Sequence, residues 1–162
     1  MGGFQAPPEA LFWKGLIYFY HIFTKRVQQG SRKIAANKQQ LVHRDLSQMI
    51  NSCETSLTRV MTDRSLKVMA KFLLLKLALF VQRERFGCDL LYITQMDAMK
   101  IAQSIQHDDY YYGQIALSEV YIDGQERKTR QAFDLLKGVI KKYPRRGEAY
   151  IKLWQLNMYC GN

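Results

Sequence analysis

The stretches AMKIAQSI (residues 98–105) and AFDLLKGV (residues 132–139) decide the fold class of this 162-residue chain. In each stretch a small residue is followed by apolar residues four and seven positions later, which is the spacing of one helical face. The matching positions are 34 residues apart: Ala98, Ala102 and Ile105 in the first, and Ala132, Leu136 and Val139 in the second. A repeated amphipathic helix at this separation predicts helical hairpins that stack on one another.

Helical periodicity also dominates the rest of the chain, and no stretch shows the alternation of a strand. The segment 24–40 is rich in Lys, Arg, Gln and Ser, and is either a loop or a solvated helix extension. Asp63 or Thr62, Asp89 and the pair Asp108-Asp109 are suited to begin helices. The fold is therefore expected to be all-α, with helices over residues 10–23, 42–61, 64–85, 90–106, 110–122, 131–143 and 148–159.

The C-terminal half resembles the tetratricopeptide and Sel-like helical repeat families over about residues 90–162. Ala132, Leu136, Val139 and Pro144 match the second-helix signature, Ala149, Tyr150, Leu153 and Gly161 match the next first helix, and residues 117–124 match the Sel-like core. Trp154 departs from the pattern, because the family has a small residue there. The resemblance implies antiparallel helix hairpins stacked as a short tetratricopeptide-like solenoid, which holds a peptide or another subunit without catalysis.

These patterns divide the chain into three parts. Residues 1–44 form a basic N-terminal helix and linker, residues 45–88 form a helical hairpin, and residues 89–162 form tetratricopeptide-like repeats, the last of them incomplete. The hairpin is either a degenerate repeat or an unrelated helical cap. The last helix carries many large apolar residues, so we expect that the chain folds back on it, that a partner covers it, or that it belongs to a longer array.

The net charge of +10 is concentrated at the two ends of the chain. Residues 1–44 have a net charge of +6, residues 45–126 of −3, and residues 127–162 of +7. Basic clusters of this kind favour contact with acidic protein surfaces, nucleic acid or anionic lipid. The residues predicted to bind a partner are the basic residues around Pro144, two aromatic residues of the last helix and three consecutive tyrosines: Lys137, Lys141, Lys142, Arg145, Arg146, Tyr150, Trp154, Tyr110, Tyr111 and Tyr112.

Motifs that carry chemistry are weak. His43-Arg44-Asp45-Leu46 resembles a kinase catalytic loop, but Ile50 stands where that loop needs Asn. The three histidines are scattered, without Cys or carboxylates at metal-ligand spacing. We therefore expect no enzyme activity, no catalytic residue, no metal and no cofactor. The three cysteines are unpatterned, which indicates an intracellular location, cytoplasmic in the first place. Residues 1–44 are poor in acidic residues, as a mitochondrial presequence is, so a mitochondrial location is the alternative.

The function expected from these features is that of a non-catalytic scaffold or adaptor subunit, which binds protein subunits of a larger intracellular complex. One alternative is a basic subunit of a ribonucleoprotein that contacts RNA. A second alternative is a peripheral membrane adaptor, anchored through the aromatic residues of segment 10–26, which is too short and too interrupted by charge to span a bilayer.

Overall fold

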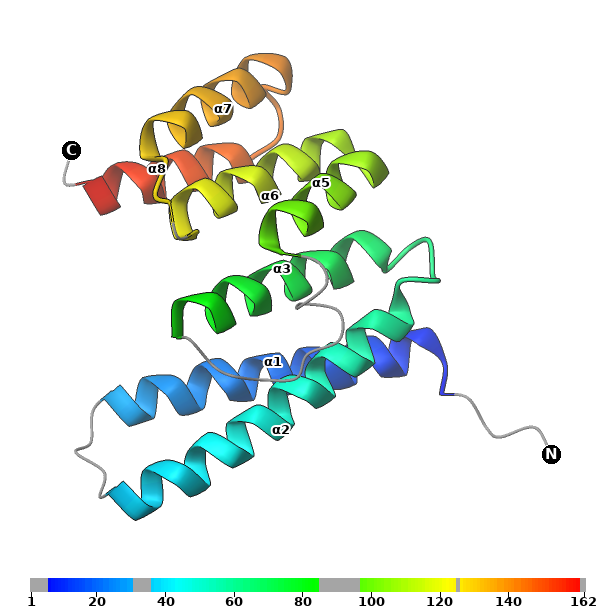
Figure 1. The fold of residues 1–162 in the computed structure, drawn as a ribbon. Helices are drawn as coiled ribbons and strands as arrows, with labels where there is room; N and C mark the ends of the chain where they lie inside the picture. The colour runs from blue at the N-terminus through cyan, green and yellow to red at the C-terminus, as the bar shows by residue number, and fades with distance from the viewer. Residues whose placement is uncertain (1–5, 31–35, 85–96, 125, 161–162) are drawn as a thin grey trace. The chain divides into compact units, whose positions relative to one another are not determined.

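The computed structural model describes residues 6–30, 36–84, 97–124 and 126–160 of the chain. Within these residues it contains seven helices and no strand, which confirms the all-α class (Figure 1). The helices are α1 (Pro8–Gly30), α2 (Ala36–Val60), α3 (Lys67–Glu84), α5 (Ala98–Asp108), α6 (Tyr110–Asp123), α7 (Thr129–Lys142) and α8 (Glu148–Cys160).

Aspartate side chains begin several of these helices. Asp109 accepts a hydrogen bond from the backbone N–H of Tyr112 at 3.0 Å, which confirms its predicted role at the start of α6. Asp63 accepts hydrogen bonds from the backbone of Ser65 and Leu66, in the turn before α3. Asp97, which is not among the predicted caps, begins α5 by accepting a hydrogen bond from the backbone N–H of Lys100 at 2.8 Å. Each bond satisfies a backbone donor that the first helical turn leaves without a partner.

Two helix boundaries in the structure bear on predictions made from the sequence. The segment 24–40 is helical on both sides of residues 31–35, because α1 continues to Gly30 and α2 starts at Ala36. The prediction that Asp89 caps a helix from Leu90 lies outside the described residues. In the described residues, the helix predicted over residues 90–106 is represented by α5, which begins at Ala98 after its cap Asp97.

The chain divides into two compact units, which we describe separately. The N-terminal unit holds α1, α2 and α3 up to Leu77. The C-terminal unit holds the rest of α3 from Ala78 and the helices α5 to α8.

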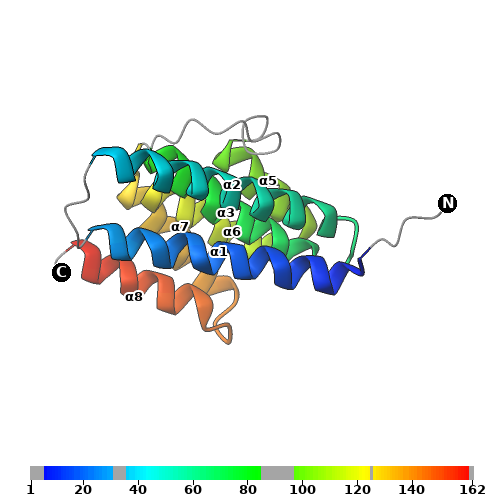
Figure 2. The ribbon, with the colours of Figure 1, turned by 90° about the horizontal axis from the view of Figure 1, so that it is seen from below.

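In the N-terminal unit α1 and α2 are antiparallel and lie side by side (Figures 1 and 2). Gly15 allows their close approach, because a Cβ atom there would lie 2.7 Å from Cδ2 of Leu57. The thiol of Cys53 donates to the carbonyl oxygen of Gly15 at 3.3 Å in the same contact. The buried core of this pair consists of Phe12, Ile22, Leu46, Ile50, Cys53, Leu57 and Val60.

In the C-terminal unit each of the helices α5 to α8 packs against the next, and α6 also contacts α8 (Figure 1). The six residues of the 34-residue period are all buried, on α5 and on α7. At Gly113, a Cβ atom would overlap the backbone of Gln106, so glycine permits the close contact of α6 with α5. An ion pair between buried Glu119 of α6 and Lys152 connects α6 to α8.

Candidate partner-binding surface

The three consecutive tyrosines at the start of α6 point in different directions, as their helical positions require. Tyr111 is buried, with 2% of its surface exposed, whereas Tyr110 is 49% exposed and Tyr112 is half-buried. The ring of Tyr111 meets the rings of Tyr112 and Tyr143 edge to face, with centroids 5.3 Å apart in both pairs. These tyrosines therefore form one cluster between the start of α6 and the end of α7.

Glu148, the first residue of α8, receives hydrogen bonds from two of these tyrosines. The hydroxyl of Tyr111 donates to Oε2 at 2.9 Å, and that of Tyr112 donates to Oε1 at 3.4 Å. Burial, together with the neighbouring carboxylate, raises the pKa of Tyr111 to about 12. The backbone N–H of Glu148 and the hydroxyl of Tyr111 lower the pKa of the Glu148 carboxyl. The carboxylate thus connects α6 and α8 while it stays ionised.

Two of the predicted basic residues lie over the rings of tyrosines at the start of α6. The guanidinium carbon of Arg146 is 4.4 Å from the ring centroid of Tyr111, and Nζ of Lys142 is 4.3 Å from that of Tyr110. Both distances are typical of cation–π contacts. Arg146 and Lys142 therefore stabilise the contact of α6 with the turn between α7 and α8.

The other predicted basic residues face solvent. Lys137, Lys141 and Arg145 are exposed, and within the described ranges none of them makes an ion pair. Lys137 has a distant contact with the ring of Phe133, at 5.9 Å. These three cations are thus available to an acidic partner.

Tyr150 and Trp154, the remaining predicted residues, are both exposed on α8. The hydroxyl of Tyr150 donates to the carbonyl oxygen of Pro144 at 3.1 Å, so its ring is held against the preceding turn. Trp154 is 63% exposed. Three more large apolar side chains are exposed on the same helix, and we call the whole set the α8 face: Tyr150, Ile151, Trp154, Met158 and Tyr159.

The structure adds Ile151, Met158 and Tyr159 to the predicted site residues. Their apolar character was visible in the sequence, but the helical pattern alone did not show which side of α8 its neighbours cover. Leu156, only two positions from Trp154, is buried. The guanidinium carbon of Arg127 lies 5.7 Å from the ring centroid of Tyr159, which places a cation at the C-terminal end of the α8 face.

A second exposed apolar stripe lies on α1, in the N-terminal unit. Trp13, Ile17 and Tyr20 are exposed at three- and four-residue spacing. Phe12 belongs instead to the core, although the sequence grouped it with Trp13 as one aromatic segment. None of the helices in the described ranges combines the length and the apolar character needed to cross a bilayer.

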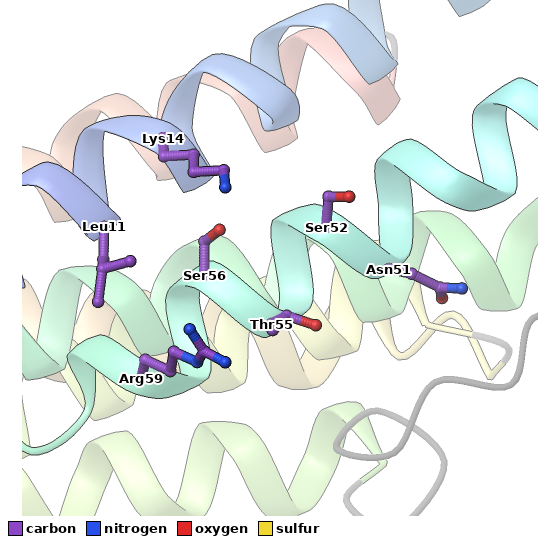
Figure 3. A pocket seen from close by; sticks show the side chains of 7 residues that line it. All are labelled: Leu11, Lys14, Asn51, Ser52, Thr55, Ser56 and Arg59. Atoms are coloured by element: carbon purple, nitrogen blue, oxygen red, sulfur yellow. The ribbon is translucent and has the colours of Figure 1, made fainter. Parts of the chain in front are cut away.

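The N-terminal unit also has a pocket of about 230 Å³ between α1 and α2 (Figure 3). Leu11 and Lys14 line it from α1, and Asn51, Ser52, Thr55, Ser56 and Arg59 line it from α2. Lys14 and the hydroxyl of Ser56 point toward one another across it (Figure 3). It is open to solvent, and none of the residues that line it is acidic.

Side chains that could bind a metal ion do not cluster in the residues that the structure describes. No three His, Cys, Asp or Glu side chains of that part of the chain lie close enough to hold a metal ion. Burial, and the charge of Glu54, raise the pKa of the Cys53 thiol to about 12, so this thiol is a poor nucleophile. Cys160 is exposed at the end of α8.

The chain matches no family model, no curated protein and no solved structure.

Proposed function

We propose that the protein is a non-catalytic helical-repeat scaffold or adaptor, which binds another protein of an intracellular assembly through the α8 face. The observation that carries this proposal is the difference between α6 and α8. Eight of the 14 residues of α6 are buried, because α5 and α7 both pack on it. Only Ala149 and Leu156 are buried among the 13 residues of α8. A large apolar surface that its own unit leaves open is typical of a protein interaction site.

The packing within the C-terminal unit supports a repeat architecture of the tetratricopeptide type. Successive helices pair, α6 contacts the second helix after it, and residues 34 positions apart occupy equivalent buried sites. Each hairpin of such an array is stabilised by its neighbours rather than by a core of its own. We propose that α6 and α8 are the first helices of successive repeats, and that α5 and α7 are second helices.

A double variant tests the proposed interaction, and the chain offers a closely matched control. Ile151→Glu with Trp154→Glu changes the α8 face, while Ile17→Glu with Trp13→Glu changes the same residue types at similar exposure on α1. Each tagged chain is expressed in its native cells, and its mass in the extract is measured by size exclusion with light scattering. We expect the unchanged chain and the α1 variant to run in a larger assembly, and the α8 variant near 19.0 kDa.

Two results would contradict the proposal: the unchanged chain runs alone, or the α8 variant stays in the assembly. Both variants place charge on side chains that are more than half exposed. Circular dichroism is expected to show the same helical content for all three proteins, which separates lost binding from lost folding.

RNA contact is a second candidate, and the exposed cations Lys137, Lys141 and Arg145 favour it. Binding through phosphates would weaken with increasing salt, roughly in proportion to the number of contacts. Replacement of the three residues with Gln is then expected to lower the salt dependence of RNA binding. If the unchanged chain shows no affinity for mixed RNA at low salt, this candidate is eliminated.

Peripheral membrane attachment is a third candidate, favoured by the stripe of Trp13, Ile17 and Tyr20 on α1. Aromatic side chains on one helical face bind the headgroup region of a bilayer. Flotation with anionic liposomes measures this directly. The α1 double variant is expected to lose flotation, and equal flotation of both double variants would eliminate the α1 stripe as an anchor.

A further inference from the structure

The two helices that cover α6 present the same kind of surface to their neighbours. On α5 and on α7 the buried positions follow one pattern: alanine first, an apolar residue four positions later and a β-branched aliphatic residue seven positions later. On α8, the main packing neighbours within the described part of this unit are α7 and α6. We therefore take the residue pattern shared by α5 and α7 as the pattern of a helix that packs on α6 or α8.

A shift of 36 residues aligns the sequence of α6 with that of α8. Gly113 corresponds to Ala149 and Val120 to Leu156, and all four are buried. In the same alignment the fully buried Ser118 corresponds to Trp154, which is 63% exposed. The position that is enclosed on α6 is thus open on α8, where it carries an indole. Helices that pack closely place small residues opposite large ones.

The charges around the α8 face also specify an occupant. None of its five residues is charged, but cations stand at both of its ends. Arg127 lies over Tyr159 at one end, and Arg145 follows Pro144, which accepts the hydrogen bond of Tyr150, at the other. Neither arginine makes an ion pair in the described ranges, whereas Lys152 is paired with Glu119 and Lys128 with Glu126. Complementary carboxylates on a partner would steer and orient its binding.

We propose that the α8 face binds an amphipathic helix of a partner protein, which has an alanine or other small residue facing Trp154, apolar residues four and seven positions further on, and carboxylates near both ends. This proposal rests on the scaffold function proposed above and specifies the chemistry of its partner. A helix of about 13 residues, some 20 Å long, matches the length of α8. The exposed indole of Trp154, at the centre of the face, is the expected hot spot.

Two stapled helical peptides with the same alanine, leucine and valine positions test the proposal. One carries Glu at its ends and the other carries Lys at the same positions. Their binding to the full chain is measured by fluorescence anisotropy of a dye on the peptide. We expect the acidic peptide to bind about tenfold more tightly than the basic one, and Arg127→Glu with Arg145→Glu to reverse this order. Trp154→Glu is expected to abolish binding, while Trp13→Glu leaves it unchanged.

Equal binding of the two peptides, or binding of neither, overturns the proposed partner chemistry. Two other results assign the α8 face to a different occupant, and so also overturn it. If Trp154→Glu dissociates a dimer of the pure chain in sedimentation, the occupant is a second copy. If Trp154→Glu lowers the melting temperature of the pure monomer, the occupant is another part of the same chain. The scaffold function is judged separately, by whether the α8 double variant leaves the native assembly.

Discussion

The hydroxyl of Tyr111 on α6 donates a hydrogen bond of 2.9 Å to Oε2 of Glu148, the first residue of α8. This bond lies between a buried ring and a carboxylate that also accepts from Tyr112. The positions of the two residues differ by 37 in the sequence, so the bond holds the start of α6 against the start of α8. Together with the ion pair of Glu119 and Lys152, this contact joins α8 to α6.

Removal of the Tyr111 hydroxyl is expected to weaken the C-terminal unit. Tyr111→Phe keeps the ring and loses a hydrogen bond to a charged group, so the free energy of unfolding should fall by about 2 kcal/mol. Tyr150→Phe is the matched control, because its exposed hydroxyl donates only to a backbone carbonyl. The control should change stability by less than about 0.5 kcal/mol. Urea unfolding measures both, and equal losses would contradict the role given to Tyr111.

Alkaline pH should destabilise the protein through the same residue. The pKa of Tyr111 is raised from 10.0 to about 12 in the folded chain, since burial and the Glu148 carboxylate disfavour its ionised form. The stability that it contributes is therefore complete below pH 10 and is lost as the pH rises from 10 to about 12. The free energy of unfolding, measured over this pH range, should fall more steeply for the unchanged chain than for Tyr111→Phe. Parallel curves would show that Tyr111 ionises as it does in the unfolded chain.

Two glycines should respond in opposite ways to replacement by alanine. Gly113→Ala places a Cβ atom into the backbone of Gln106, so α6 must move away from α5 at a cost of about 2 kcal/mol. Gly138, on the exposed side of α7, has no atom within 4 Å of the added Cβ position. Gly138→Ala should therefore stabilise the helix by about 0.5–1 kcal/mol. Melting temperatures compare the two, and a loss of stability at Gly138 would contradict the described packing of α7.

The ion pair of Glu119 with Lys152 should be sensitive to the loss of one partner. Lys152→Ala removes the paired cation from a carboxylate that is almost fully buried, and should cost about 3 kcal/mol. Exposed Lys100, on α5, provides the control, and Lys100→Ala should be nearly neutral. Glu119→Gln combined with Lys152→Met should recover most of the loss. A small effect of Lys152→Ala would show that α8 does not pack on α6 through this pair.

The sequence was sufficient to predict the helical class and much of the C-terminal packing. The 34-residue period predicts this packing because Ala132, Leu136 and Val139 are all buried on one face of α7. Asp109 was recognisable as a cap because a polar residue preceded an apolar run. Asp97 was missed because apolar residues continue on its N-terminal side, so the period gave no helix start there.

The sequence alone does not predict which apolar side chains lie on the surface. Periodicity indicates which side of a helix is apolar, but burial depends on which other helix covers that side. Phe12 and Trp13 are neighbours in a continuous aromatic segment, yet the first is in the core and the second is 60% exposed. Likewise Arg146 was predicted as a partner-binding cation, and it lies on the ring of Tyr111 within the same unit. The contact of Arg146 with Tyr111 joins residues far apart in the chain, so a local sequence pattern does not predict it.

The most direct test of the central claim, that the α8 face binds a partner protein, is photocrosslinking from that face in the native cell. Benzoylphenylalanine is placed at position 154 and, as the control, at position 13, which is about equally exposed. The account predicts one discrete protein adduct from position 154 and not from position 13, with the crosslinked site in an acidic amphipathic helix of the partner. Crosslinks from position 154 only to this chain's own residues, to lipid or to RNA, or none at all, would contradict it.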